Sequence, residues 1–184
     1  DLMHLAENLQ NNTRHSWTST GRRESVAEHS WRLTVMAYFV KDEFSEADID
    51  RVIRMCMFHD MGEAFTGDIP AFEKKESHER AERRCVEDWV SSLPEPYRED
   101  LRALYGEMEE QRTLEAKIFK ALDKMEALIS HNEADISTWL PLEYELNLTY
   151  GEAQVQFSEY MKKLREEINR DTRDKIKREQ KKQQ

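Results

Sequence analysis

The chain has 184 residues, of which 38% are hydrophobic and 36% charged. That length corresponds to a single compact domain. Only 5 glycines and 4 prolines are present, too few for the many tight turns of an all-β sandwich or barrel. The two cysteines, Cys56 and Cys85, exclude a disulfide scaffold and a thiolate metal cluster. They fit a reducing compartment, so we expect a cytoplasmic location.

The formal net charge is −10, but it is unevenly distributed. Residues 162–184 hold 10 Lys or Arg against 5 Asp or Glu, so the rest of the chain is strongly acidic. An acidic body repels phosphates, and we therefore expect no nucleic-acid partner. A run of about 18 apolar residues, the minimum for a membrane span, is absent from the sequence.

Hydrophobic residues recur at helical spacing, and no segment alternates cleanly as a strand would. The pattern predicts an all-α fold, a compact single bundle of about six or seven helices. Polar residues 13–24 are expected to form a loop, as is the segment that holds Trp139. Ser25 lies three residues before Glu28, which is the spacing of a helix-starting capping box. The expected helices cover residues 1–12, 25–41, 45–65, 74–92, 97–108 and 114–132, with a last helix from about Tyr150.

The charge distribution also predicts how the chain is organised. We expect one domain over residues 1–160, followed by a basic C-terminal helix or tail over residues 161–184. A mixed, largely basic segment of this kind is usually a solvent-exposed helix. A tail that binds nucleic acid or a partner protein is the alternative.

The pair His59-Asp60 ends a mostly apolar stretch of predicted helix. A buried charge without a partner costs several kcal/mol, so this pair needs compensation. A structural hydrogen bond or ion pair would provide it. A divalent metal would provide it as well, because imidazole and carboxylate are both common ligands.

Two further donors could complete a metal site: His29 near the start of its helix, and Asp123 on an otherwise apolar helix face. A set of two imidazoles and two carboxylates suits Mn, Fe, Co, Ni or Zn better than Ca or a soft metal. A lone histidine on a helix is more often a surface or satisfied core residue, so spacing alone leaves both readings open. The candidate ligands are His29, His59, Asp60 and Asp123.

Two acidic residues follow this pair and are candidates for proton transfer. Glu63 lies four residues after His59, which predicts that both share a helix face. A carboxylate there could exchange a proton with water or a leaving group. Asp68 lies just past the expected helix end. The alternatives are a surface glutamate for Glu63 and an ordinary turn aspartate for Asp68.

Three segments in this order resemble the HD-domain phosphohydrolase superfamily. They are residues 24–30 (ESVAEHS), 58–70 (FHDMGEAFTGDIP) and 122–126 (LDKME). The similarity is greatest to the 5′-deoxynucleotidase branch and its HD domain-containing eukaryotic relatives, and it covers about residues 1–145. It implies an all-helical domain that hydrolyses the phosphomonoester of deoxyribonucleoside 5′-monophosphates. It also implies one divalent metal, held by His29, His59, Asp60 and Asp123.

The resemblance also implies roles for other residues. Glu63 matches the catalytic acidic residue, and Asp68 matches the acidic residue near the sugar and the attacking water. Arg14 and Trp17 best match the arginine and tryptophan that hold phosphate and sugar. The segment between Trp17 and His29 is two residues shorter than is usual in the family. Arg22 or Arg23 therefore remain alternatives to Arg14.

The expected partner is a small-molecule phosphate ester. Members of the family often form dimers, and the apolar residues of 139–160 would either supply a homodimer face or cover the domain's own core. Lys74, Lys75 and His78 could reach the phosphate, although a solvated helix face is the simpler reading. Two other functions stay open: hydrolysis of a different phosphate ester, and a non-catalytic helical module that binds a metal or ligand.

Overall fold

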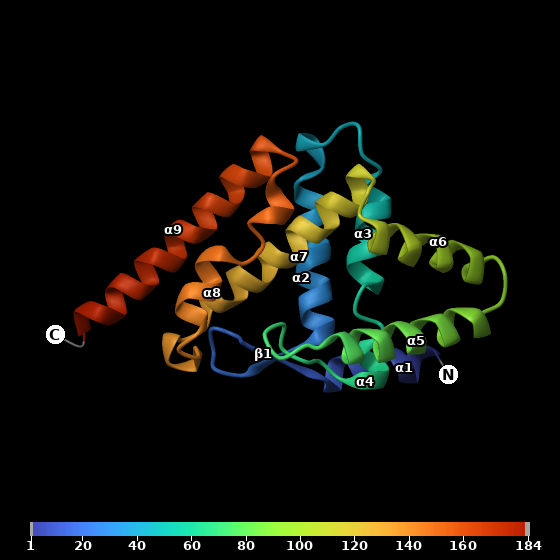
Figure 1. The fold of residues 1–184 in the computed structure, drawn as a ribbon, viewed down its shortest axis with the longest axis horizontal. Coiled ribbons are helices and arrows are strands. Elements are labelled where there is room, and N and C mark those ends of the chain that lie inside the picture. Colours follow the sequence, from blue (N-terminus) through green and yellow to red (C-terminus); the bar gives the residue numbers. More distant parts are fainter. Residues whose placement is uncertain (1, 183–184) are drawn as a thin grey trace.

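The computed structural model describes residues 2–182 and confirms the all-α class (Figure 1). Two of its nine α-helices in that range, α4 and α8, are short, which is why the total exceeds the six or seven expected. Three short 3-10 helices complete the chain. The elements are α1 Leu2–Asn11, β1 Thr13–Trp17, β2 Arg23–Ser25, α2 Val26–Phe39, η1 Lys41–Glu43, α3 Ile49–Phe58, α4 Glu63–Thr66, α5 Glu76–Ser92, α6 Tyr97–Glu110, α7 Leu114–Glu133, η2 Ile136–Thr138, α8 Glu143–Thr149, η3 Ala153–Val155 and α9 Glu159–Lys182.

Helix α7 crosses α2 and α3 at the centre of the molecule (Figure 1). Its apolar residues recur at helical spacing on the faces that meet these two helices, and burying them is the main source of stability. Helices α5 and α6 extend on one side of this centre, and α8 and α9 lie on the other. Side chains that are fully buried in this core include Leu33, Met55, Ile118, Leu122 and Met125.

Residues 13–25 form a two-stranded antiparallel hairpin, so the expectation of a plain loop was wrong. The strands are short and polar and lack alternating hydrophobicity, so the period of the sequence gave no signal. Gly21, with φ of +83°, lets the chain reverse between them. The predicted capping box is confirmed: Ser25 accepts a hydrogen bond from the Glu28 backbone, and the Glu28 side chain accepts one in return.

The single helix expected over residues 45–65 was also wrong, because α3 ends at Phe58 and α4 begins at Glu63. The turn between them carries His59 and Asp60. At Gly62 a Cβ atom would lie 2.5 Å from Cγ of Glu82, so only glycine lets this turn approach α5 so closely. The turn therefore positions chemistry-bearing side chains that a continuous helix would spread over its surface.

The C-terminal third differs from the expectation as well. Helix α8 occupies part of a predicted loop, and the last helix begins at Glu159 rather than near residue 150. Buried Arg165 of α9 donates hydrogen bonds to the carbonyl groups of Leu148 and Tyr150, so a cation covers the end of α8. A short helix that depends on a distant cation carries little local signal.

Helix α9 is packed against α7 and α8, with its last buried residue at Thr172 and a further contact from Lys175 to the Asn132 carbonyl, and then extends away from the body (Figure 1). The division into a domain over 1–160 and a tail over 161–184 stays a prediction, and residues 1 and 183–184 lie outside the described range. Within residues 2–182, no helix combines the length and hydrophobicity needed to cross a bilayer.

Candidate metal centre and active site

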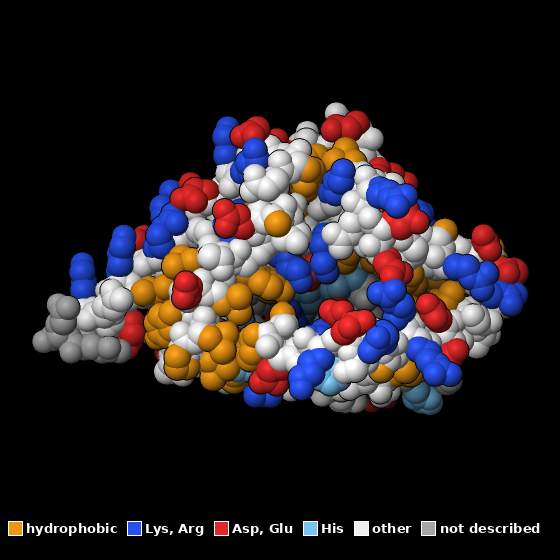
Figure 2. All heavy atoms as spheres, in the orientation of Figure 1, with side chains coloured by type: hydrophobic (Ala, Val, Ile, Leu, Met, Phe, Trp, Pro, Cys, Tyr) orange, Lys and Arg blue, Asp and Glu red, His pale blue; other side chains and the backbone are white. Residues whose placement is uncertain are grey.

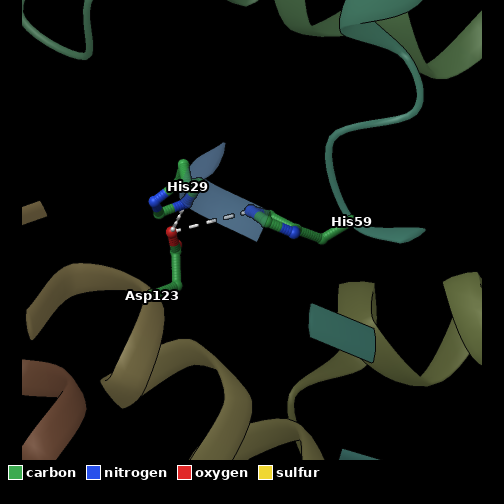
Figure 3. Close-up of side chains that lie close together, drawn as sticks. All are labelled: His29, His59 and Asp123. Atoms are coloured by element: carbon green, nitrogen blue, oxygen red, sulfur yellow. Dashed lines mark ion pairs between the residues drawn. The ribbon is translucent and has the colours of Figure 1, made fainter. Parts of the chain in front are cut away.

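Three helices bring two histidines and an aspartate together at the centre of the molecule (Figure 3). His29 comes from the first turns of α2, His59 from the end of α3 and Asp123 from α7. Oδ1 of Asp123 lies 3.4 Å from Nε2 of His29 and 3.8 Å from Nε2 of His59. One potential ligand atom from each residue lies within 4.8 Å of the others. These distances suit a single shared ion.

Asp60 joins the group from the turn after α3. Its Oδ2 lies 3.0 Å from Nε2 of His59 and 3.9 Å from Nε2 of His29. Adjacent residues of a helix point about 100° apart, but here the helix has already ended, so the two neighbours can face one point. The structure therefore brings together His29, His59, Asp60 and Asp123, the four ligands that the sequence predicts.

The histidines are oriented as metal ligands. Nδ1–H of His59 donates to the backbone carbonyl of Cys56 at 2.9 Å, and Nδ1 of His29 is hydrogen-bonded to the Glu126 carboxylate. Both Nε2 atoms are buried and have no hydrogen-bond partner among residues 2–182. In a neutral imidazole with Nδ1 bonded in this way, the Nε2 lone pair points at the centre, which is how proteins prepare histidines for a metal. His29, His59 and Asp123 thus form a group able to bind a divalent metal.

Two lysines fix the orientation of Asp123. Nζ of Lys120 lies 3.0 Å and Nζ of Lys124 3.4 Å from Oδ2, the carboxylate oxygen that faces away from the histidines. Burial alone would raise the pKa of Asp123, but these two cations and His29 outweigh it and hold the pKa well below its usual value. The aspartate is therefore ionised and presents its other oxygen, Oδ1, to the centre.

Glu126 is a fully buried carboxylate behind His29. It accepts the hydrogen bond from His29, pairs with Nε of Arg32 at 2.9 Å and accepts from Oγ of Ser130 at 3.3 Å. Burial would raise its pKa, but His29 and the nearby arginines outweigh this effect and lower it. The sequence analysis missed this residue. Its position three residues after Asp123, inside a buried helix, was the available signal.

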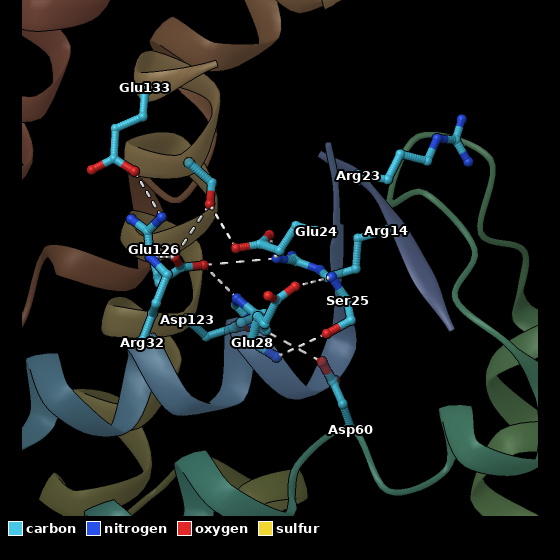
Figure 4. A network of polar contacts seen from close by, with 12 residues as sticks. Arg14, Arg23, Glu24, Ser25, Glu28, Arg32, Asp60, Asp123, Glu126 and Glu133 are labelled. Carbon is cyan, nitrogen blue, oxygen red and sulfur yellow. Dashed lines mark hydrogen bonds and ion pairs between the residues drawn. The ribbon is translucent and has the colours of Figure 1, made fainter. Parts of the chain in front are cut away.

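Arg14 extends from β1 into the same network (Figure 4). Its Nη1 lies 2.9 Å from the buried carboxylate of Glu24 and 3.7 Å from that of Glu126. Ser130 connects the two carboxylates, donating to Glu24 at 3.0 Å. Burial acts to lower the pKa of Arg14, but the surrounding carboxylates, Asp60 and Asp68 included, raise it. Arg14 is therefore a permanent buried cation beside the metal centre.

The other two candidate arginines lie elsewhere. Arg22 is exposed and pairs with Glu28 at 2.6 Å. Arg23 points away from the network, and its guanidinium lies 5.1 Å from the ring centre of Trp17 (Figure 4). Trp17 also meets the ring of His15 edge-on at 5.0 Å and lines neither of the two cavities beside the metal centre. Of the three arginines, only Arg14 reaches this centre.

Glu63, the first residue of α4, is only 5% exposed, and its Oε2 has no hydrogen-bond partner in the described chain. Burial and the charges of Asp60 and Asp68 raise its pKa to about 10. Side-chain amides of α1 hold the short helix in place, since Asn12 donates to the Glu63 carbonyl at 2.6 Å and Asn8 donates to the next one. A protonated carboxyl group is therefore fixed near the metal centre.

Asp68 follows Gly67, whose φ of +77° requires a residue without a side chain. Burial raises the pKa of the Asp68 carboxyl, and the positive charges of Arg14 and Lys74 act against that rise. Two acidic groups near the centre, Asp68 and Glu63, thus hold protons more tightly than free carboxylic acids.

Two hollows lie near this centre, and one of them reaches it. A groove of about 630 Å³ between α5, α6 and α7 opens onto His59 and Asp60 and is visible as the dark central hollow in Figure 2. Lys74, which pairs with Glu82 at 2.5 Å, and Lys120 line it. Lys74 is thus part of the groove wall rather than a solvated helix face. A smaller cavity of about 90 Å³ lies beyond Arg14 and Asp68.

Comparison with known proteins identifies the family of the chain. The model of the HD-domain family matches residues 6–165. The human protein named 5′-deoxynucleotidase HDDC2 is 34% identical over 136 residues, which are 72% of this chain and 66% of that protein. The yeast 5′-deoxynucleotidase YBR242W from Saccharomyces cerevisiae is 30% identical over 112 residues, 58% of this chain and 46% of that protein. The chain thus spans about two-thirds or less of the length of these curated relatives.

Two solved structures share the fold. One from Magnetospirillum magnetotacticum, described as a predicted metal-dependent phosphohydrolase, has a TM-score of 0.78 and 25% identity and covers 96% of this chain and 91% of its own. The other, a conserved hypothetical protein from Pyrococcus furiosus, has a TM-score of 0.73 and 28% identity. The match covers 92% of this chain and 98% of that protein.

Proposed function

The chain belongs to the HD-domain family, and from that premise we propose that it hydrolyses deoxyribonucleoside 5′-monophosphates to deoxynucleoside and phosphate with one divalent metal. One observation carries the proposal: two buried Nε2 atoms without partners face two carboxylates, and a third, protonated carboxyl group, Glu63, lies close by. A purely structural metal site needs the ligands but not a spare acid. The similarity to proteins named 5′-deoxynucleotidase supports the choice of substrate.

The metal would be held by His29, His59, Asp60 and Asp123. When bound, it supplies positive charge that neutralises the phosphate and activates water for attack. Mn, Co, Fe, Ni and Zn all accept this mixture of donors, so the donor set leaves the choice among them open. The lysines beside Asp123 would keep that ligand ionised and oriented.

Arg14 would bind the phosphate group of the substrate. Glu24 lies 2.9 Å from its Nη1, and the other N–H groups of a guanidinium remain available as donors to phosphate oxygens. Lys74 and Lys120 line the groove that opens onto Asp60, so they would attract the anionic substrate. The acidic body of the protein discourages long nucleic acids, which favours a mononucleotide.

Glu63 and Asp68 would move and orient the protons of the reaction. Breaking the ester bond leaves an alkoxide, which needs a proton, and a carboxyl group with a raised pKa is a suitable donor. Asp68 faces the smaller cavity and would orient the sugar or the attacking water. Contact between Trp17 and the sugar also stays a prediction, and its position against His15 favours an indirect contribution.

Assembly and location remain proposals as well. Among the apolar residues of 139–160, Trp139 is buried in the domain's own core, whereas Leu140 and Leu142 are exposed and available to a second copy. We propose a homodimer on that basis. Both cysteines are free, which is consistent with the proposed cytoplasmic location.

The test is phosphate release from a panel of deoxy- and ribonucleoside 5′-monophosphates. The protein is stripped of metal and reloaded with Mn²⁺ or Co²⁺, and Asp60→Ala serves as the control. We expect release from deoxynucleotides by the reloaded protein and none from the control. If the reloaded protein binds metal but releases phosphate from no nucleotide, the proposed substrate is wrong, and triphosphates, cyclic nucleotides and other esters become the candidates.

A further inference from the structure

The smaller cavity, which we call the α8 pocket, lies between the β1 strand, residues 70–72, α7 and α8. One part of its wall is apolar, formed by Pro70, Phe72, Leu128 and Leu146. The other part is unusually polar for a recess of about 90 Å³: it carries Arg14, His15, Ser16, His131, Glu143 and Asn147. Apolar walls with a few converging polar groups are typical of sites that bind small organic molecules.

A buried carboxylate organises the polar wall. Glu143 is 1% exposed, and its Oε2 accepts a hydrogen bond from the Leu140 backbone at 2.6 Å. Its Oε1 lies 3.3 Å from Nε2 of His15 and 3.7 Å from Nδ1 of His131. The two imidazole rings are 6.4 Å apart, on either side of the carboxylate. These two histidines and Glu143 do not lie close enough together to hold one metal ion. Among residues 2–182, only the metal centre has three such side chains close together.

Two buried polar atoms of this wall make no hydrogen bond within the described chain. They are Oγ of Ser16 and Nε2 of His15, which lies 3.3 Å from Glu143 without hydrogen-bond geometry. Asn147 is 4% exposed, and its amide nitrogen lies 3.5 Å from Nδ1 of His131. Buried polar groups are normally paired, because leaving one unpaired costs free energy. A ligand in the pocket would pair them.

The α8 pocket adjoins the metal centre. Arg14 and Asp68 line it, and both also feel the charge of Asp60. A phosphate held by Arg14 at the metal centre would therefore direct the rest of its ester towards the pocket. The cavity volume is about 90 Å³, and one water molecule needs about 10–15 Å³ of such volume. The pocket therefore has room for one ring system and not for a whole nucleotide.

We propose that the α8 pocket binds the nucleobase of the substrate and that the side-chain amide of Asn147 reads its edge. The inference rests on the proposed function. An amide offers one acceptor and two donors side by side, which matches the donor and acceptor pattern on the edge of a base. His15 and Phe72, whose rings meet edge-on at 5.6 Å, form the aromatic part of the wall. Trp17 acts as a positioning residue, because it packs against His15.

The test compares two kinds of substrate. Deoxynucleoside 5′-monophosphates carry the base, and 2-deoxyribose 5-phosphate offers the same sugar and phosphate without it. In Asn147→Leu we expect the ratio of kcat/KM for the nucleotide to that for the sugar phosphate to fall about 10-fold, the loss expected when one or two hydrogen bonds to a base edge disappear. Glu145→Gln, on the exposed face of the same helix, is the matched control and should keep the parent ratio.

A second variant and a binding measurement protect the test against misfolding. Asn147→Asp keeps the shape of the side chain and removes its donors, and thermal unfolding shows whether each variant is folded. Titration calorimetry then measures the dissociation constants of the four deoxynucleosides with the metal-free protein. We expect the variant to bind at least one of them about 10-fold more weakly than the parent does.

The outcomes separate this proposal from the proposed function. If nucleotides are hydrolysed but folded Asn147 variants keep the parent ratio and the parent affinities, the pocket does not read the base and the inference is overturned. If the parent hydrolyses no deoxynucleotide yet binds deoxynucleosides through Asn147, the pocket stands and the proposed reaction fails.

Discussion

Two clusters of histidine and carboxylate lie near Arg14, and they use the same residue types differently. In the metal centre, Nδ1 of each histidine is already bonded, to Glu126 or to a backbone carbonyl, so both Nε2 atoms face Asp60 and Asp123. In the α8 pocket, one carboxylate stands between two imidazoles, and the unpaired polar atoms face a cavity. The first arrangement suits an ion and the second an organic ring.

The pKa shifts of the histidines also differ between the two clusters. Burial and Arg14 act to lower the pKa of His29, but the negative charges of Asp123 and Glu126 outweigh them and raise it to about 9. Burial lowers the pKa of His131, and the single carboxylate beside it does not compensate. Carboxylates outnumber imidazoles in the metal centre, so this cluster attracts positive charge. In the α8 pocket His131 stays neutral, which suits an uncharged ligand.

The most severe way to break the metal centre is Asp123→Asn. The change removes one ligand charge and leaves two lysines facing an amide, so we expect loss of bound metal and a fall in kcat/KM of about 10³-fold. Metal analysis and phosphate release measure both effects. Asp88→Asn, on the exposed face of α5, is the control. Full metal content in a folded Asp123→Asn protein would contradict the ligand assignment.

Glu63→Gln separates the chemistry from the metal. Glutamine keeps the shape but cannot exchange a proton, so we expect kcat to fall about 10²- to 10⁴-fold while metal content stays unchanged. The comparison of metal analysis with turnover is decisive here. Turnover at the parent rate would show that this buried acid takes no part in the reaction.

The sequence predicts the long helices and the candidate metal ligands from different signals. The long helices α2, α5, α6 and α7 carry apolar residues at helical spacing, and Ser25 marks the start of α2 by its cap. Of the four candidate ligands, His59, Asp60 and Asp123 stand out because polar and charged residues are rare in apolar stretches. Each of these signals lies within a short segment of sequence.

The turn after α3, helix α8 and the α8 pocket depend on contacts between distant segments of the chain. Gly62, in the turn after α3, lies close to Glu82 of α5, and α8 is held by Arg165 of α9. The α8 pocket joins His15 to Glu143, which are far apart in the chain. Periodicity carries no information on such pairs, so neither the turn nor the pocket could be predicted.

Glu126→Gln tests how the metal centre depends on the residue behind His29. The change weakens the hydrogen bond that orients His29 and keeps His29 itself. We expect metal affinity to fall about 10- to 100-fold, because His29 loses the carboxylate that orients its ring. Glu133→Gln is the matched control, since Glu133 pairs with the same Arg32 from the exposed side at 2.7 Å. Competition with a metal-binding dye measures the affinity. Equal affinities in the two variants would contradict this role for Glu126.

The smallest expected effect concerns His131 in the α8 pocket. Its pKa is lower in the folded protein than the usual value of about 6.5, so the unfolded chain binds its proton first as the pH falls. Protonation of this site therefore costs stability below about pH 6.5, and the cost stops growing below the folded pKa. His131→Gln removes the site, so its melting temperature should fall less than that of the parent between pH 7 and pH 5. If His131→Gln follows the parent instead, His131 is not held neutral by its burial, and the electrostatic contrast between the two clusters fails.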